Sequence, residues 1–195
     1  PGTLPKLNKK VVEFAIKMGL AIGSKIAPKQ YFDRKNYFYP DLPKVYQITQ
    51  DKTPICIGGS VLVHLKEGDK KMEFHHIHLE EDAGKSLHEG DNPFSFIDYN
   101  RAGTPLIEMV TEPAIHSAEE AFAMVSEVRK LVRYLGICEG NMEEGSLRAD
   151  VNISLRPKGT FTLGTKVEIK NMNSLRNIQR AIEYECRRQE EALLK

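Results

Sequence analysis

The chain has 195 residues, of which 41% are hydrophobic and 28% are charged, a composition typical of a globular protein with a substantial core. Its 28 Lys and Arg residues nearly balance its 27 Asp and Glu residues, and the formal net charge of +1 argues against a protein that coats a polyanion. The 3 cysteines are widely spaced and odd in number, which argues against a disulfide framework and a zinc knuckle and suggests the cytosol, and the chain has no apolar run long enough to predict a membrane span.

The N-terminal third predicts a helix followed by an aromatic segment. Asn8 is a suitable N-cap for a helix that continues through Ile16. In residues 30–43, five aromatic side chains are interleaved with charged ones, among them Arg34 and Lys35. Aromatic rings between cations can stack bases and hold phosphates. The alternative is a short core segment whose rings anchor a loop.

Residues 55–81 predict a β-hairpin whose second strand carries several histidines. Glycines 58 and 59 indicate a turn, and a second turn near Gly68 leads into the strand 72–81. Period two places His76, His78 and Glu80 on one face of that strand. Imidazole and carboxylate are transition-metal ligands, although histidines on an exposed strand face are commonly just solvated.

Two further carboxylates stand among apolar residues. Glu81 ends a row that contains Ile77 and Leu79, and a half-buried carboxylate needs a cation or a hydrogen-bond donor. Glu108 interrupts an apolar strand pattern and either faces water or, together with Glu81, offers oxygen ligands to Mg2+. Lys85 belongs to a Gly-Lys-Ser sequence that lacks the rest of a phosphate-binding loop, so it is only a candidate phosphate contact.

The C-terminal half predicts two helices on either side of a hairpin. A capping box at Ser117 begins a helix that Gly136 ends, and a final helix starts near Ser174. Between them, residues 147–155 and 166–170 alternate apolar and polar side chains. If these runs pair, one sheet face carries Arg148, Asp150, Asn152, Lys166, Glu168 and Lys170. Such a face either positions a phosphate and a metal, or is solvated and held by cross-strand ion pairs.

This order of elements predicts an α+β fold with a mostly antiparallel sheet and flanking helices, in a single domain that spans residues 1–195. The chain starts at Pro1 without a methionine, and its last helical pattern runs to Lys195. We therefore expect it to be a piece of a longer protein.

Six segments taken together resemble the GatB family, the B subunits of the aspartyl/glutamyl-tRNA amidotransferases. They are FDRKNYFYPD (32–41), YQITQ (46–50), LEEDAGKS (79–86), NRAGTPLIE (100–108), MEEGSLR (142–148) and KNMNS (170–174). The resemblance covers nearly the whole chain and implies the cradle-shaped catalytic domain, which is similar in fold to glutamine synthetase and guanido kinases. In that family an N-terminal Gly-Leu-Glu-x-His strand is expected before Pro1, and a helical domain and tail that grip tRNA are expected after Lys195.

The resemblance also implies an activity, cofactors and partners. The family uses ATP and Mg2+ to phosphorylate the side-chain carboxylate of mischarged Glu-tRNA(Gln) or Asp-tRNA(Asn). Ammonia from the glutaminase, which is the A subunit, then displaces phosphate in a heterotrimer that also contains the B and C subunits. Phosphoryl transfer depends on positioning and charge neutralisation, which fits a chain without a nucleophile–base set.

On this resemblance, Glu81 and Glu108 are expected to hold the metal. From their charge and the family resemblance, we also expect catalytic roles for six residues: Arg34, Lys35, Arg148, Lys166, Glu168 and Lys170. Cofactor contacts are expected from Lys85, Asp150 and Asn152. A different interpretation is a non-catalytic module that docks tRNA or another component of the complex. A free-standing guanido-type kinase is a third, which the tRNA-family motifs disfavour.

Overall fold

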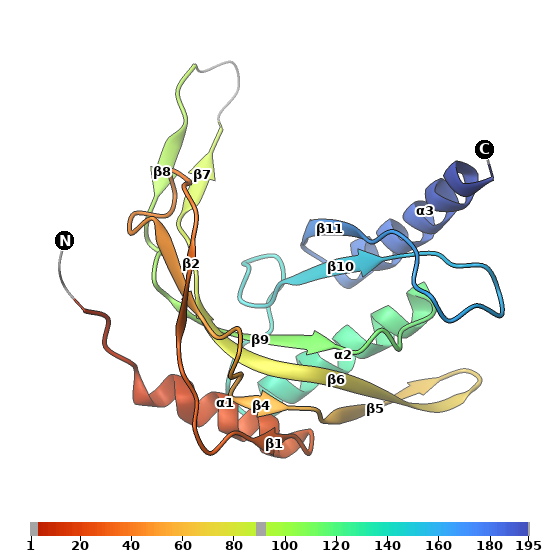
Figure 1. The fold of residues 1–195 in the computed structure, drawn as a ribbon, viewed down its shortest axis with the longest axis horizontal. Coiled ribbons are helices and arrows are strands. Elements are labelled where there is room, and N and C mark those ends of the chain that lie inside the picture. Colours follow the sequence, from red (N-terminus) through yellow and green to blue (C-terminus); the bar gives the residue numbers. More distant parts are fainter. Residues whose placement is uncertain (1–3, 89–92, 195) are drawn as a thin grey trace. The chain divides into compact units, whose positions relative to one another are not determined.

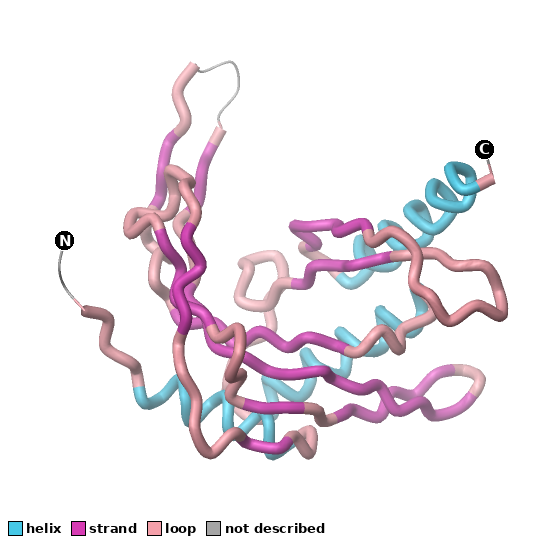
Figure 2. The backbone as a smooth tube through the Cα atoms, in the orientation of Figure 1, coloured by secondary structure: helices cyan, strands magenta, loops and turns pink. Residues whose placement is uncertain are grey.

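A computed structural model of the chain describes residues 4–88 and 93–194, whose backbone is coloured by secondary structure in Figure 2. The chain forms two compact units, one made of the residues up to Ser60 with Glu73–Glu112, the other of Val61–Met72 with the residues from Pro113 onward. Helices and antiparallel strand pairs make up both, which confirms the α+β class. Within the described residues, no helix is long and apolar enough to cross a membrane.

The first unit begins with helix α1 (Lys9–Ala21), labelled in Figure 1. The side chain of Asn8 accepts a hydrogen bond from the amide of Lys10 at 2.9 Å, so the predicted N-cap is confirmed. Gly19 lets the helix approach the sheet closely. A Cβ atom there would lie 2.5 Å from Sγ of Cys56 and 2.8 Å from Cδ1 of Ile26, so a larger residue would push the helix away.

Strand β6 (Gly68–Glu81) is the longest strand and organises the main sheet. Strands β1 (Lys25–Ile26), β4 (Cys56–Ile57), β6 and β5 (Ser60–Leu65) follow in the order β1-β4-β6-β5, and β9 (Pro105–Thr111) also pairs with β6. Ile77 and Leu79 on β6 are buried, so one row of this strand is fixed in the core. The row on the other face is thereby also fixed.

Glycines 58 and 59 do not reverse the chain, and the turn predicted there is wrong. Strands β4 and β5 on either side of them both pair with β6, and the pairing is only interrupted. The amide of Gly58 donates to the carbonyl of His75, and the amide of Phe74 donates to the carbonyl of Gly59, each at 2.9 Å. Both glycines have positive φ angles, 68° and 101°, which glycine adopts at least cost. Two adjacent glycines are typical both of a turn and of an interruption of this kind, so the sequence pattern alone does not distinguish them.

Two short strand pairs complete the first unit. Strand β2 (Asp33–Asn36) pairs with β3 (Tyr46–Thr49), and β7 (Lys85–Leu87) pairs with β8 (Phe96–Asp98). Of the five aromatic residues around β2, only Tyr37 is partly buried, and the others are exposed. The interpretation of residues 30–43 as a core segment is therefore wrong, because these rings are too exposed to form one.

In the second unit, helix α2 (Ala118–Tyr134) and helix α3 (Leu175–Leu193) pack together, and α3 also packs on strand β10 (Ala149–Ile153). Strand β10 pairs with β11 (Val167–Met172), which confirms the predicted hairpin. The core consists of Ala121, Met142, Ile153, Ile178 and Ile182.

Both predicted helix starts in this unit are confirmed. The hydroxyl groups of Ser117 and Ser174 each accept a hydrogen bond from an amide in the first turn, at 3.1 Å. The carboxylate of Glu120 accepts from the amide of His116 at 2.7 Å and thereby satisfies a second donor. The apolar pattern from Ala121 to Leu135 predicts that Phe122 is buried, and this prediction is wrong, because Phe122 is 39% exposed.

A buried polar network fastens α3 to β10. The Glu185 carboxylate accepts two hydrogen bonds from Arg188, at 2.8 and 2.6 Å, and one from Gln189 at 2.9 Å. Gln189 in turn donates to the carbonyl of Ile153 and accepts from the amide of Leu155. Because the bonds from Arg188 and Gln189 stabilise the ionised form, the pKa of Glu185 falls to about 2.

We expect Glu185→Gln to destabilise the chain at neutral pH by an amount that shrinks in acid. A carboxylate with a folded pKa of about 2 and an ordinary pKa of 4.5 contributes stability that is fully present above 4.5 and is lost as the pH falls through 2. Thermal unfolding of wild type and variant at several pH values measures this difference. Glu190→Gln, on the exposed side of the same helix, is the control. An equal difference at neutral pH and in strong acid would contradict the prediction.

Candidate divalent-cation site

One face of β6 brings three side chains with metal-ligand atoms together beside β9. In the antiparallel register of these strands, His78 lies opposite Glu108. Glu80, two residues further along β6, lies on the same face as His78. One ligand atom from each of these three side chains lies within 4.8 Å of the other two. All three residues belong to the first unit.

The geometry of this group suits a divalent cation. Nε2 of His78 lies 3.6 Å from Oε2 of Glu80 and 3.5 Å from Oε2 of Glu108. The imidazole is 11% exposed and the Glu108 side chain 50%, so the group is closed on one side and open on the other. One imidazole nitrogen and two carboxylate oxygens form a donor set that Mg2+, Mn2+ or Zn2+ accepts. Because solvent reaches the Glu108 side chain, further ligands such as water or phosphate oxygens can approach from that side.

Glu80 is held in its anionic form. Burial raises the pKa of this carboxyl, but the hydrogen bond and the charge of His78 oppose burial, and the charge of Lys35 and a hydrogen bond from Thr49 add to them. The net effect lowers the pKa below its ordinary value. The Thr49 hydroxyl is 3.4 Å from Oε2 of Glu80. Glu80 is therefore a charged oxygen ligand at neutral pH.

A chain of imidazole rings leads away from the site along β6. Nε2 of His76 lies 3.0 Å from Nδ1 of His78, and Nδ1 of His76 lies 2.7 Å from Nδ1 of His75. Burial, followed by the neighbouring charges of His78 and His75, lowers the pKa of His76 to about 4. His76 is therefore neutral at physiological pH.

Glu81 lies outside the group of three. Its carboxylate pairs with the ammonium group of Lys44 and accepts a hydrogen bond from the amide of Ile48 at 2.9 Å. The side-chain amide of Gln47 donates to the carbonyl oxygen of Glu81 at 2.7 Å. These contacts tie β6 to β3. The assignment of Glu81 as a metal ligand stays a prediction, and the structure does not bring Glu81 together with Glu108 in the cluster.

The cations predicted in the first unit lie on two short strands. Arg34 and Lys35 on β2 are opposite Ile48 and Gln47 on β3. The Arg34 guanidinium stacks on the ring of Tyr46 at 4.6 Å from its centroid. Lys35 is near enough to Glu80 for its charge to lower the pKa of that carboxyl. Lys85 is exposed on β7, opposite Asp98.

The other six predicted site residues lie on or next to the β10–β11 hairpin of the second unit. In its register Asn152 lies opposite Glu168, and a bulge between Ala149 and Val151 shifts the pairing at one end. The polar row of this hairpin is exposed, as the alternation predicted, while Ile153 on the other row is buried. Its members are Arg148, Asp150, Asn152, Lys166, Glu168 and Lys170.

Lys170 sits between two carboxylates of this row. Its ammonium group is 3.2 Å from Oε1 of Glu168 and 3.5 Å from Oδ2 of Asp150. The hydrogen bond to Glu168, together with the charges of both acids, outweighs burial and raises the pKa of Lys170. The pair of Lys170 with Asp150 is a cross-strand ion pair, the kind of contact in the alternative left open by the sequence, whereas the pair with Glu168 lies within β11. They do not exclude a ligand on the same face.

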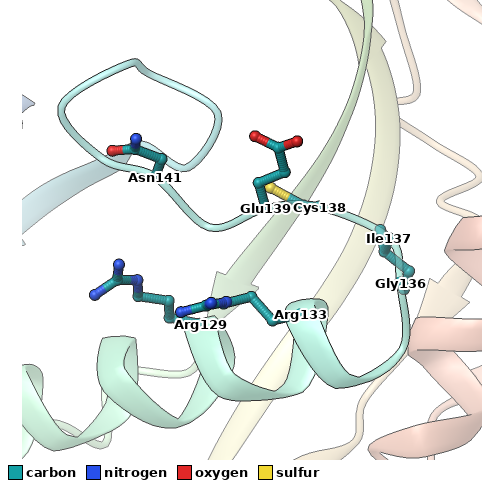
Figure 3. Close-up of a pocket in the computed structure, with 7 residues that line it drawn as sticks. All are labelled: Arg129, Arg133, Gly136, Ile137, Cys138, Glu139 and Asn141. Atoms are coloured by element: carbon teal, nitrogen blue, oxygen red, sulfur yellow. The ribbon is translucent and has the colours of Figure 1, made fainter.

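The second unit also contains a pocket of about 620 Å³ beside the C-terminal end of α2. Figure 3 shows Arg129 and Arg133 extending from this helix toward the loop that carries Cys138 and Asn141. Nε of Arg129 donates to the carbonyl of Gly140 at 2.6 Å and so fixes the loop on the helix. No residue that the sequence predicted for catalysis lines this pocket.

Comparison with known proteins gives a consistent result. The sequence profile of the GatB/GatE catalytic domain matches residues 1–194. Among curated proteins, the B subunits of the aspartyl/glutamyl-tRNA(Asn/Gln) amidotransferases of Synechococcus sp. (strain JA-2-3B'a(2-13)) and Nitrosococcus oceani are each 56% identical over 99% of this chain. That of Desulfotalea psychrophila is 55% identical over 100% of the chain. The matched region is 41% of each relative's length, so the chain spans less than half of these proteins.

We expect the chain to bind Mn2+ through His78, Glu80 and Glu108. Replacing Glu108 by Gln keeps the size of the side chain but removes one anionic ligand, so the affinity is expected to fall about 10-fold or more. Titration calorimetry measures the affinity. Glu73→Gln, which changes an exposed carboxylate of β6 outside the group, is the matched control. Equal Mn2+ affinity in wild type and Glu108→Gln would show that the cation binds elsewhere.

Proposed function

This chain belongs to the family of the GatB/GatE catalytic domain, and from that premise we propose that it activates a carboxylate in a tRNA-dependent amidotransferase. The substrate is the side-chain carboxylate of glutamate on tRNA(Gln) or of aspartate on tRNA(Asn). This carboxylate attacks the γ-phosphate of ATP to give an acyl phosphate and ADP. Ammonia, released from glutamine by another component of the complex, then displaces phosphate and forms the amide.

The observation that carries the proposal is the group formed by His78, Glu80 and Glu108. A carboxylate and a triphosphate repel each other, so their reaction depends on charge neutralisation. A divalent cation such as Mg2+, when bound, supplies that neutralisation. His78 and the two carboxylates fit such a cation because they combine one nitrogen with two oxygen donors on a site that is open on one side.

Other residues of the first unit support this site. Lys35 adds positive charge near Glu80 and is a candidate phosphate contact. We propose that Arg34, whose guanidinium is fixed on Tyr46, contacts a phosphate or the substrate carboxylate. Glu81 holds Lys44 and the amide of Ile48, and thereby stabilises β3, the strand that pairs with the β2 residues Arg34 and Lys35. Lys85 is a further candidate contact for ATP.

In the second unit we propose that the polar row of the β10–β11 hairpin contacts the nucleotide or the substrate carboxylate. The carboxylates of Asp150 and Glu168 both contact the ammonium group of Lys170 and so orient this otherwise flexible side chain. Asn152 offers an amide next to this set, opposite Glu168. Arg148 and Lys166 lie at the two ends of the row and are exposed.

The proposed partners follow from the reaction. The mischarged tRNA brings the substrate carboxylate, and a glutaminase supplies the ammonia. The glutaminase is the A subunit of a cytoplasmic heterotrimer that also contains a C subunit. A non-catalytic docking module for tRNA or for one of these partners is the second candidate. The exposed aromatic residues around β2, interleaved with cations, favour a contact with nucleic acid in either case.

We expect Glu80→Gln and Glu108→Gln, each in the assembled complex, to lower ADP release with mischarged tRNA by about 10- to 100-fold. Binding of the tRNA is expected to persist, because neither change removes a positively charged side chain that could contact its phosphates. Coupled measurement of ADP release, with tRNA binding measured in parallel, tests both points. Glu73→Gln is again the matched control.

An unchanged rate of ADP release in both variants would contradict the enzymatic role of these carboxylates. If the two variants instead keep ADP release and lose tRNA affinity, the docking function replaces the catalytic one.

A further inference from the structure

Three histidines on β6 form a hydrogen-bonded series that ends at the candidate cation site. His75 is exposed, His76 is partly buried and His78 is buried, so the series runs from the surface inward. The rings of His76 and His78 are stacked, with centroids 5.1 Å apart and planes at 29°. The rings of His75 and His76 meet edge to face, with centroids 5.0 Å apart.

The nitrogen atoms used in this series determine which tautomers are compatible with a cation. The two nitrogens of His78 face different partners: Nε2 faces Glu80 and Glu108, whereas Nδ1 lies 3.0 Å from Nε2 of His76. A neutral imidazole carries a single proton, and a metal ligand needs an unprotonated nitrogen. For Nε2 of His78 to bind a cation, the proton must therefore reside on Nδ1 and have an acceptor there.

His76 provides this acceptor. With Nε2 of His76 accepting, its own proton resides on Nδ1, which lies 2.7 Å from Nδ1 of His75. His75 accepts that hydrogen bond and turns its Nε2–H to the solvent. Each ring then donates one hydrogen bond and keeps one proton, so the arrangement is complete without any charged imidazole.

We propose that His76 is a positioning residue for the cation site: it accepts the Nδ1–H of His78 and leaves the Nε2 of His78 unprotonated and directed at Glu80 and Glu108. The inference rests on the proposed function, because it takes these three residues as the cation ligands. A hydrogen-bond acceptor behind a ligating imidazole fixes both the tautomer and the orientation of the ring, and increases its strength as a donor. Such acceptors are commonly carboxylates or carbonyl groups, and here the acceptor is another imidazole, with a second one behind it.

The test compares two replacements of His76 in the full chain. His76→Leu removes the acceptor, and we expect it to weaken Mn2+ binding about 10- to 100-fold. His76→Gln places an amide oxygen where Nε2 of the imidazole lies, and we expect it to restore affinity to within a few-fold of wild type. Titration calorimetry with Mn2+ gives the affinities, and circular dichroism with thermal unfolding shows whether each variant is folded.

A second measurement observes the wild-type side chains directly. In the wild-type chain loaded with Zn2+, which is diamagnetic, nitrogen-15 spectra of the histidine side chains are expected to show His78 protonated at Nδ1 and ligated at Nε2. The same spectra are expected to show His76 protonated at Nδ1 and unprotonated at Nε2. Assignment of the rings uses the His76→Gln and His75→Gln variants.

The outcomes separate this inference from the proposed function. If wild type binds Mn2+, Glu108→Gln weakens the binding and His76→Leu leaves it unchanged, the positioning role is wrong while the cation site stands. A spectrum with His78 ligated through Nδ1 overturns the inference even if His76→Leu fails to fold. If Glu80→Gln and Glu108→Gln both leave the affinity of wild type unchanged, the cation site fails, and the role of His76 fails with it.

Discussion

The register between β6 and β9 is the constraint on which the candidate site depends. Side chains of a strand alternate between two faces, so a slip of one residue would move Glu108 away from His78. Burial of Ile77 and Leu79 prevents that slip on β6, since both would lose their core contacts. The apolar row of the strand thus keeps the ligand row in place, and packing on the opposite face of the sheet determines which side chains meet.

Features that depend on neighbouring residues alone were predictable from the sequence. The N-caps at Asn8, Ser117 and Ser174 each use a side chain that bonds an amide two or three residues away. The β10–β11 hairpin follows from two alternating runs. Alternation also placed His78 and Glu80 on one face of β6, and the apolar neighbours of Glu108 marked it as unusual. Local patterns therefore identified the three members of the candidate site as separate observations.

Features that depend on distant parts of the chain were not predictable in this way. Nothing in the sequence around Glu81 indicates Lys44 as its partner, since 37 residues separate them. Val45, beside Lys44, has a φ angle of 58°, which is uncommon for a β-branched residue and has no sequence signature. The sequence also does not give the register between β6 and β9, so it could not identify the partners of Glu108 on β6. The family resemblance suggested Glu81 and Glu108 as a pair, whereas the structure groups Glu108 with His78 and Glu80.

Anomalous diffraction from crystals grown with Mn2+ and a non-hydrolysable ATP analogue tests the central claim most directly, because it locates the cation without reference to activity. The account predicts one strong peak at about 2.1 Å from Nε2 of His78 and from carboxylate oxygens of Glu80 and Glu108, with a phosphate oxygen completing the coordination. A Mn2+ peak bound to the nucleotide and to other side chains, with these three residues making no contact to it, would contradict the account.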